Sequence, residues 1–167
     1  MTVNDNWEPY AAGSDNPVSK VWSQIDYASV HTYAYWDAGF EKWDFRQLDD
    51  AALIGTAFEY ARKNFQEARK ALDAASIQIP IVIGETGWQN LPTARENSAL
   101  VSNFAELIAG PERQQIYYRT MQKWAYGENW DTPGDGYSRP ASMFYFAAFD
   151  EPWKGQDDNW GIWNALR

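Results

Sequence analysis

The chain contains no cysteine and only one histidine among its 167 residues. Disulfide bonds, thiol nucleophiles and cysteine-based zinc sites are therefore excluded. It has no apolar run near the roughly 18 residues that a membrane-spanning helix needs, and its N-terminus lacks the basic and then apolar pattern of a signal peptide. We expect a soluble chain with no membrane partner.

Positive charge is also scarce. The chain carries 14 Lys and Arg residues against 23 Asp and Glu residues, which gives a formal net charge of −9 and a sequence pI near 4.5. An acidic surface repels phosphate backbones and anionic lipid headgroups. We therefore expect no nucleic-acid partner, whereas neutral ligands remain open.

Aromatic residues are abundant, with 10 Trp, 10 Tyr and 8 Phe making up 17% of the chain. Part of this content must pack in the core, because aromatic side chains bury large areas. Tryptophan also offers a flat apolar face and a polar N–H, which suit a neutral ligand with flat CH faces and many hydroxyls. The composition is compatible with simple packing or with a carbohydrate-binding surface.

The apolar pattern predicts strands and helices in alternation. Four segments are typical of buried strands, namely residues 1–4, 26–33, 79–84 and 142–149. An amphipathic helix capped by Asp49 or Asp50 is expected between the second and third strands. Its inward face would hold Ile54, Phe58, Ala61, Phe65, Ala68 and Leu72, and its outward face Glu59, Arg62, Lys63, Gln66, Arg69 and Lys70.

Three further helices complete the alternation. One should begin at Pro111, a favourable first-turn residue, with Ile116, Thr120, Met121 and Trp124 facing inward. Shorter helices are expected over residues 17–24 and 98–108. No repeat or linker divides the chain, so we expect a single domain over residues 1–167.

This order favours an α/β fold in which parallel strands are covered by helices. No helix opens on a glycine-rich phosphate-binding fingerprint, which removes the usual evidence for an open doubly wound sheet. A complete (β/α)₈ barrel needs about 250 residues. Four strand and helix units therefore predict half of a TIM barrel, with about four parallel strands.

The residues that follow the strands combine acids with aromatics. Glu85 comes directly after the apolar run 79–84, where a charge is costly unless it is paired or useful. Active sites of parallel α/β folds lie at the carboxyl ends of the strands. Carboxylates and flat rings on one rim are what glycoside cleavage needs, so Glu85 is a candidate catalytic residue. The other rim segments are residues 5–8, 32–36 and 150–154.

Two long motifs carry a family resemblance. Ile83-Gly84-Glu85-Thr86-Gly87-Trp88 is followed about sixty residues later by a segment running from Phe144 to Asp150-Glu151-Pro152-Trp153-Lys154, and then by Trp160-Gly161. Together they resemble the family 17 glycoside hydrolases, which are β-1,3-glucanases and β-glucan transglycosylases. The segment 26–36 is similar to the sixth barrel strand of that family, with Ala34 where proline is usual. The resemblance covers almost the whole chain.

The resemblance implies retaining chemistry on a (β/α)₈ barrel, with Glu85 as the nucleophile. Glu151 and Lys154 would help to hold the nucleophile and the sugar, and Tyr33 would contact the sugar. Trp88 and Trp153 are expected in the substrate-binding set, with simple packing as the alternative. The ligand would be a β-glucan oligosaccharide or polysaccharide, with no cofactor and no metal. The family suggests a periplasmic, membrane-attached or extracellular longer parent.

One feature departs from the family pattern. The family acid/base is the glutamate of an Asn-Glu pair, and no Asn-Glu dipeptide occurs in this sequence. Retaining cleavage needs two carboxyl groups about 5 to 5.5 Å apart, and Glu8 is a weak substitute. The chain is thus expected to be either a catalytic half that is weak or inactive alone, or a noncatalytic β-glucan-binding or assembly module. His31 is expected to be a core residue rather than a catalyst.

A half barrel leaves two strand edges uncovered, at residues 1–4 and 142–149. Uncovered edges and apolar patches promote association. We therefore expect completion by dimerisation, either as a homodimer or with a complementary half-barrel.

Overall fold

The computed structural model describes residues 1–13, 16–36, 48–91, 109–151, 153 and 159–163. The chain forms two compact units. The first unit contains Met1–Thr32, Glu59–Thr86 and Met121–Phe144, and the second contains Tyr33–Phe58, Gly87–Thr120 and Tyr145–Arg167. The first unit carries almost all of the sheet, and the second carries the segments that follow strands β2, β3 and β4.

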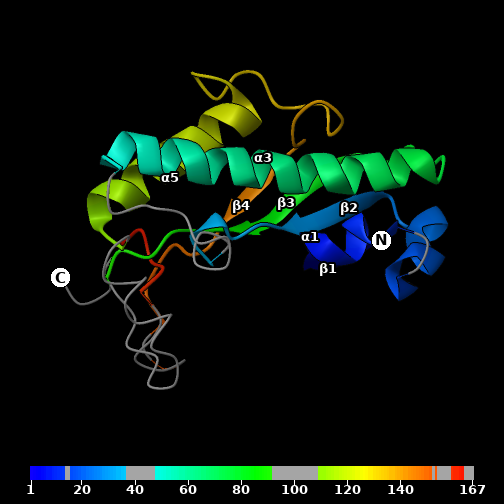
Figure 1. Cartoon of the computed structure of the whole chain (residues 1–167), viewed down its shortest axis with the longest axis horizontal. Helices are drawn as coiled ribbons and strands as arrows, with labels where there is room; N and C mark the ends of the chain where they lie inside the picture. The colour runs from blue at the N-terminus through cyan, green and yellow to red at the C-terminus, as the bar shows by residue number, and fades with distance from the viewer. Residues whose placement is uncertain (14–15, 37–47, 92–108, 152, 154–158, 164–167) are drawn as a thin grey trace. The chain divides into compact units, whose positions relative to one another are not determined.

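The four predicted strands are all present. They are β1 (Thr2–Asn6), β2 (Tyr27–His31), β3 (Ile81–Thr86) and β4 (Met143–Tyr145). They form one sheet in the order β1-β2-β3-β4 (Figure 1), and the strands are parallel. The sequence prediction of an α/β fold with four parallel strands and intervening helices is confirmed.

Strand β4 is shorter than the predicted segment 142–149. In the second unit, the chain after Tyr145 pairs with residues near the C-terminus instead of continuing a strand of the sheet. Ala147 N–H donates to Trp160 O at 3.1 Å, Trp163 N–H donates to Ala148 O at 2.9 Å, and Phe149 forms an isolated parallel bridge with Trp163. The apolar run is therefore shared between the sheet and this short pairing.

The register of β2 and β3 places their residues on two faces. Ala28 pairs with Ile81 and Val30 with Ile83, and all four side chains are completely buried. Alternation puts Ser29 and Val82 on the opposite face, where Ser29 also lies beside Asn4 of β1.

Helix α3 (Asp50–Ala74) buries its predicted face. The Asp49 side chain caps the helix by accepting the Ala52 N–H at 2.8 Å. Five of the six predicted inward residues are at most 1% exposed and Phe58 is half-buried; the five are Ile54, Ala61, Phe65, Ala68 and Leu72. The spacing of three and four residues in the sequence was thus sufficient to identify the buried face.

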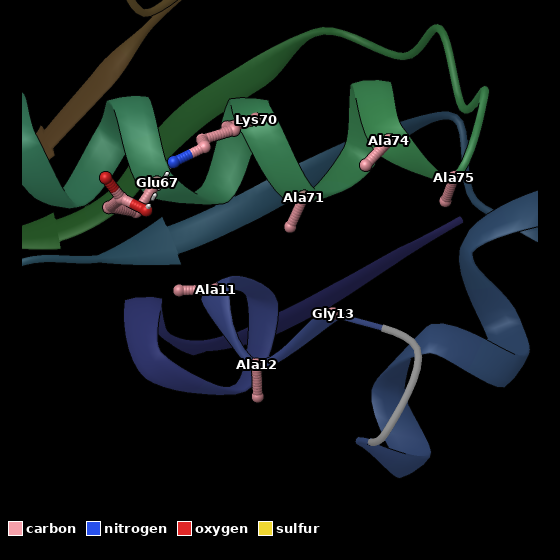
Figure 2. A pocket seen from close by; sticks show the side chains of 8 residues that line it. All are labelled: Ala11, Ala12, Gly13, Glu67, Lys70, Ala71, Ala74 and Ala75. Atoms are coloured by element: carbon pink, nitrogen blue, oxygen red, sulfur yellow. Dashed lines mark ion pairs between the residues drawn. The ribbon is translucent and has the colours of Figure 1, made fainter.

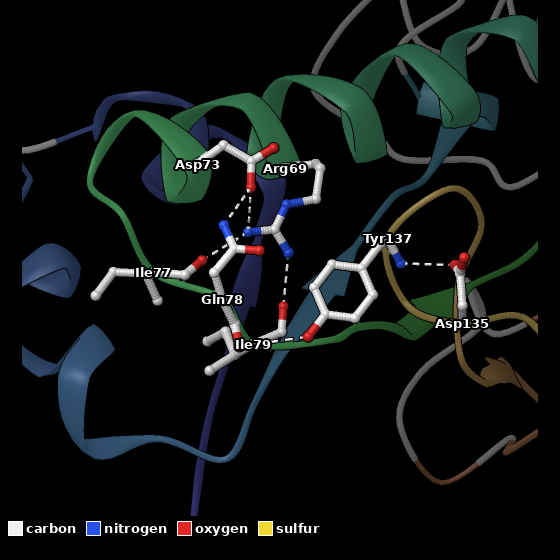
Figure 3. A network of polar contacts seen from close by, with 7 residues as sticks. All are labelled: Arg69, Asp73, Ile77, Gln78, Ile79, Asp135 and Tyr137. Carbon is white, nitrogen blue, oxygen red and sulfur yellow. Dashed lines mark hydrogen bonds and ion pairs between the residues drawn. The ribbon is translucent and has the colours of Figure 1, made fainter.

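Arg69 is the exception on the predicted outward face, because it is only 7% exposed. Its guanidinium donates to Ile79 O at 2.6 Å and to Ile77 O at 2.7 Å, and it forms an ion pair with Asp73 at 2.8 Å (Figure 3). These bonds satisfy the carbonyls of the loop that leads into β3. Arg69 therefore fixes the end of α3 to the start of the next strand.

A turn at Asp135 supports this network from the other side. The guanidinium of Arg69 lies over the ring of Tyr137, 5.2 Å from its centroid, and the Tyr137 hydroxyl donates to Gln78 O at 3.3 Å. Asp135 accepts the backbone N–H of Tyr137 at 2.8 Å (Figure 3). It also accepts the backbone N–H of Ser138 at 2.8 Å. These bonds to the charged carboxylate lower the pKa of Asp135 to about 2.

Helix α5 (Pro111–Tyr126) begins at the predicted residue, but the face that it buries differs from the predicted one. Its fully buried residues are Tyr117, Met121 and Ala125, and Gln114 is also buried. The predicted inward residues Ile116, Thr120 and Trp124 are only half-buried. The prediction missed this face because Gln114, although polar, is buried with its amide donating to Trp88 O at 2.8 Å and to Trp160 O at 3.1 Å.

The remaining helices are short. Helix α1 (Trp7–Ala11) follows β1, and the 3₁₀ helix η2 (Pro17–Gln24) matches the predicted segment. Asn16 caps η2 by accepting the Val18 N–H at 2.9 Å. The predicted helix over residues 98–108 lies outside the described residues. No helix in the described part of the chain has the length and apolarity to cross a membrane.

Candidate active site

Three polar residues share one row at the carboxyl edge of the sheet. Asn6 of β1 pairs in register with His31 of β2, and His31 pairs with Glu85 of β3. Each residue lies at or near the end of its strand. This is the edge at which parallel α/β folds place reactive groups, and the row unites the predicted catalytic residue with the only histidine.

A β-bulge brings Glu85 opposite His31. Val30 pairs with Ile83, but the register then shifts so that His31 pairs with Glu85 and Gly84 has no partner in β2. The extra residue turns the Glu85 side chain toward the His31 side chain. Oε2 of Glu85 lies 3.5 Å from Nδ1 of His31, and the two side chains are 37% and 15% exposed, respectively.

The bulge requires glycine at position 84. A Cβ atom on Gly84 would lie 2.2 Å from Ser29 Oγ, 2.4 Å from Asn4 Oδ1 and 3.2 Å from His31 Cδ2. Ser29 and Asn4 are already joined by a hydrogen bond of 2.6 Å. The absence of a side chain at Gly84 therefore allows Ser29 and Asn4 to approach the backbone of β3.

The backbone of Glu85 is tied to a helix through Thr32. The Thr32 N–H donates to Glu85 O at 2.9 Å. The Thr32 hydroxyl accepts from the amide of Asn64, on α3, also at 2.9 Å, and Thr32 and Asn64 are each 1% exposed. This buried support holds the end of β3 on rigid elements, as a precise site requires.

An aromatic cluster fills the second unit. Tyr35 contacts Trp88 and Trp160 with ring centroids 5.2 and 5.4 Å apart, and Tyr33 lies 5.3 Å from Trp160. Tyr145 is half-buried beside other tyrosines, and burial of its hydroxyl raises the pKa of that group. The rings of Tyr33 and Trp88, both predicted to bind substrate, thus belong to one packed cluster.

The exposure of these predicted residues differs widely. Trp88 is completely buried, whereas Trp153 is 76% exposed. Tyr33 and Glu151 are half-buried. Lys154 lies outside the described residues. A sugar contact for each of these five residues stays a prediction, and the burial of Trp88 favours packing for that residue.

Several supporting residues were not identified from the sequence. Asn6 and Thr32 were noted only as members of the rim segments, and Asn64 was missed. Their roles depend on the register of β1 and β2 and on the side of α3 that faces the strand end. Asp150 was noted only as a rim acid. In the structure its carboxylate accepts the Gly161 N–H at 2.7 Å, so it shapes the loop after β4.

The described residues contain no group of three or more His, Asp or Glu side chains arranged to bind a metal ion. They do contain a groove in the first unit between the end of α1 and the second half of α3 (Figure 2). Small side chains line most of it, with Glu67 and Lys70 at one side. None of the predicted site residues lies in this groove.

No protein-family model matches the chain. It is similar to a glucan 1,3-beta-glucosidase of Arthroderma benhamiae, with 25% identity over 178 residues that cover 98% of this chain and 46% of the relative. Among solved structures, it is similar to an endo-laminarinase from Formosa, with a TM-score of 0.73, 24% identity, and coverage of 98% of this chain and 42% of that one.

It is also similar to an active-site mutant of a Rhizomucor miehei β-1,3-glucanosyltransferase in complex with laminaritriose. That match has a TM-score of 0.55 and 19% identity, and it covers 87% of this chain and 41% of that one. The chain therefore spans less than half of the length of each of these proteins. The structural likeness shows that the fold, four parallel strands with helices, matches part of a TIM barrel.

Proposed function

We propose that this chain is the nucleophile-bearing part of a retaining β-1,3-glucan hydrolase or transglycosylase of the family 17 type. The observation that carries the proposal is the position of Glu85, which the bulge sets beside His31 at the carboxyl edge of the sheet. The similar proteins support the substrate, since their names specify β-1,3-glucan or laminarin chemistry. A further Rhizomucor miehei structure with a TM-score of 0.53 is named as glycoside hydrolase family 17.

In the proposed reaction, the Glu85 carboxylate attacks the anomeric carbon of a β-1,3-glucan. The bond from that carbon to the leaving oxygen breaks, and a general acid protonates the oxygen. Water or an acceptor sugar then displaces Glu85 from the glycosyl intermediate, which gives hydrolysis or transglycosylation. Glu85 is regenerated as a carboxylate.

The proton donor must be a second carboxyl group about 5 to 5.5 Å from Glu85. The chain contains no Asn-Glu dipeptide that would match the family acid. We propose that a polypeptide completing the barrel supplies this group, either a complementary half-barrel or a second copy of the chain. On this account the chain alone is weak or inactive toward natural glucan.

The proposed sugar-binding residues all belong to the second unit. Tyr33, Glu151, Trp153 and Lys154 would contact the sugar, and the 76% exposure of Trp153 is consistent with a stacking role. Trp88 is completely buried, and its proposed role is to support the binding residues from within the aromatic cluster, where its ring packs against Tyr35.

Two substrates that differ in the acidity of the leaving group test this assignment. The dinitrophenolate of a 2,4-dinitrophenyl β-laminarioside departs without being protonated. The chain should therefore cleave this substrate even without a general acid. The corresponding unactivated laminari-oligosaccharide should be cleaved far more slowly. Glu85→Gln should reduce the dinitrophenyl reaction by orders of magnitude, whereas Glu59→Gln, at a 63% exposed helix position, should not change it.

The second candidate function is a noncatalytic β-glucan-binding or assembly module. The observation that favours it is the group of strongly exposed aromatic side chains in the second unit, which are Phe149, Trp153 and Trp163. The same experiment separates the two candidates. Binding of laminari-oligosaccharide without any turnover of the dinitrophenyl glycoside would support the module and exclude the nucleophile.

A further inference from the structure

His31 has a position that the sequence motifs do not explain. Its ring lies against the backbone of Gly84, since a Cβ there would be 3.2 Å from His31 Cδ2. Its Nδ1 lies 3.5 Å from Glu85 Oε2. Its Nε2 is buried and has no hydrogen-bond partner among the described residues. A buried polar atom without a partner is costly, so the placement of this ring calls for an explanation other than core stability.

The neighbours of the ring determine where its proton lies. A neutral imidazole carries one proton, on either Nδ1 or Nε2. A lone pair on Nδ1 would face the negative carboxylate of Glu85 and be repelled by it. The arrangement therefore favours the proton on Nδ1, from which it is donated to Oε2.

A donor facing one carboxylate oxygen restricts rotation of the whole group. The ring of His31 beside Oε2 would therefore fix the orientation of the Glu85 carboxylate. Fixed orientation of a reacting group contributes strongly to rate, and small misplacements are expensive. The bulge at Gly84 and the buried Thr32–Asn64 hydrogen bond hold the two strand ends that carry this pair.

We propose that His31 is a positioning residue for Glu85: His31 presents its Nδ1–H to Oε2 and so fixes the orientation of the carboxylate. The effect of His31 on catalysis rests on the proposed function, whereas its contact with Glu85 does not. The proposed contact between Nδ1–H and Oε2 is independent of any activity, and the two parts have separate tests.

The proposed contact can be tested directly, because His31 is the only histidine in the chain. In protein without a histidine tag, the two ¹⁵N signals of the His31 ring report which nitrogen carries the proton. We expect the Nδ1–H tautomer in the wild type. Glu85→Leu should shift the ring toward the Nε2–H form that imidazole prefers in water, and Glu59→Gln should leave it unchanged. A tautomer that does not respond to Glu85→Leu overturns the proposal, whether or not the chain is active.

The positioning role is tested with two amide substitutions. The side-chain nitrogen of asparagine can occupy the place of Nδ1, whereas that of glutamine reaches the place of Nε2. With the dinitrophenyl glycoside, His31→Gln should lower kcat about 100-fold. His31→Asn should keep kcat within about tenfold of the wild type. KM should change little in both, and melting temperatures verify that both variants fold.

The outcomes separate the two proposals. Equal kcat values for the wild type and both variants would refute the positioning role while leaving Glu85 as nucleophile. A tautomer that responds to Glu85→Leu in a chain that cleaves no activated glycoside would support the contact between His31 and Glu85. That result would refute both the proposed function and the positioning role in catalysis.

Discussion

Gly84 separates the last apolar residue of β3 from Glu85, and the space beside it is already filled. An added methyl group would lie 2.2 Å from Ser29 Oγ and 2.4 Å from Asn4 Oδ1. These two side chains are also bonded to each other, so neither can move without breaking that bond. The glycine is therefore a requirement of the strand end itself.

Gly84→Ala should lower the free energy of unfolding by about 1–3 kcal/mol through overpacking. Gly55 is the matched control, because it lies in α3 and a Cβ there would meet no atom within 4 Å. Gly55→Ala should raise stability by about 0.5–1 kcal/mol. Denaturant melts of the two variants measure both effects, and a Gly84→Ala protein as stable as the wild type would contradict the packing described here.

Trp88 and Trp153 provide a second comparison at the residue scale. Trp88→Ala removes a completely buried ring and should cost about 3–5 kcal/mol of stability. Trp153→Ala removes a 76% exposed ring and should change stability by less than about 0.5 kcal/mol, while weakening laminari-oligosaccharide binding several-fold. Thermal melts and calorimetric titration test this contrast, which fails if Trp153→Ala binds as tightly as the wild type.

The sequence singles out Glu85 because a charge directly follows the apolar run 79–84, and its catalytic role stays a prediction. Its pairing with His31 was not identifiable, because that pairing depends on a one-residue register shift between two strands fifty residues apart in the sequence. Trp88 was ambiguous for a similar reason, since composition does not distinguish a packed ring from a ligand-binding one.

Helix α3 shows how far periodicity reaches at the scale of an element. Its buried stripe follows the apolar spacing, but Arg69 lies among the polar residues of the pattern and is nevertheless buried. The reason lies beyond the helix, because its guanidinium binds the carbonyls of Ile77 and Ile79 after the chain has turned back. In α5 the buried Gln114 likewise bonds to carbonyls outside its helix. The positions of α3, α5 and η2 were predictable, whereas α1 and these buried polar residues were not.

Arg69→Met should retain much of the side-chain volume while removing the donors to Ile77 O and Ile79 O. We expect a loss of about 2–4 kcal/mol in the free energy of unfolding, because both carbonyls lose a charged donor. Lys70 is adjacent and 78% exposed, so Lys70→Met should change stability by less than about 0.5 kcal/mol. Urea unfolding compares the two, and equal effects would mean that the Arg69 network does not stabilise the fold.

The order of strands and helices determined the whole-molecule prediction. Alternation with nearly continuous apolar strands indicated a parallel sheet, and the sheet has that order and direction. The similar proteins are more than twice as long as the matched chain. Among the described residues, Phe144 of β4 is 61% exposed, and the edge strand β1 exposes Asn4 and Asn6. These features support the proposal that another polypeptide completes the barrel.

Light scattering at micromolar concentration tests the simplest form of that proposal. A homodimer would scatter with about twice the chain mass of 19.2 kDa, and dilution should shift it toward the monomer. A monomer at all concentrations would exclude the second copy and leave a complementary half-barrel as the proposed partner.

The central claim is that Glu85 is a glycosyl-accepting nucleophile, and covalent trapping tests it most directly. A 2-deoxy-2-fluoro-β-laminaribiosyl fluoride reacts by loss of fluoride, so it needs no general acid, and the fluorine at C2 slows release of the intermediate. Mass spectrometry of the digested protein should find the fluorosugar on the peptide that contains Glu85. The adduct should be absent in Glu85→Gln and present in Glu59→Gln. Labelling of another carboxylate, or no labelling at any concentration, would contradict the account.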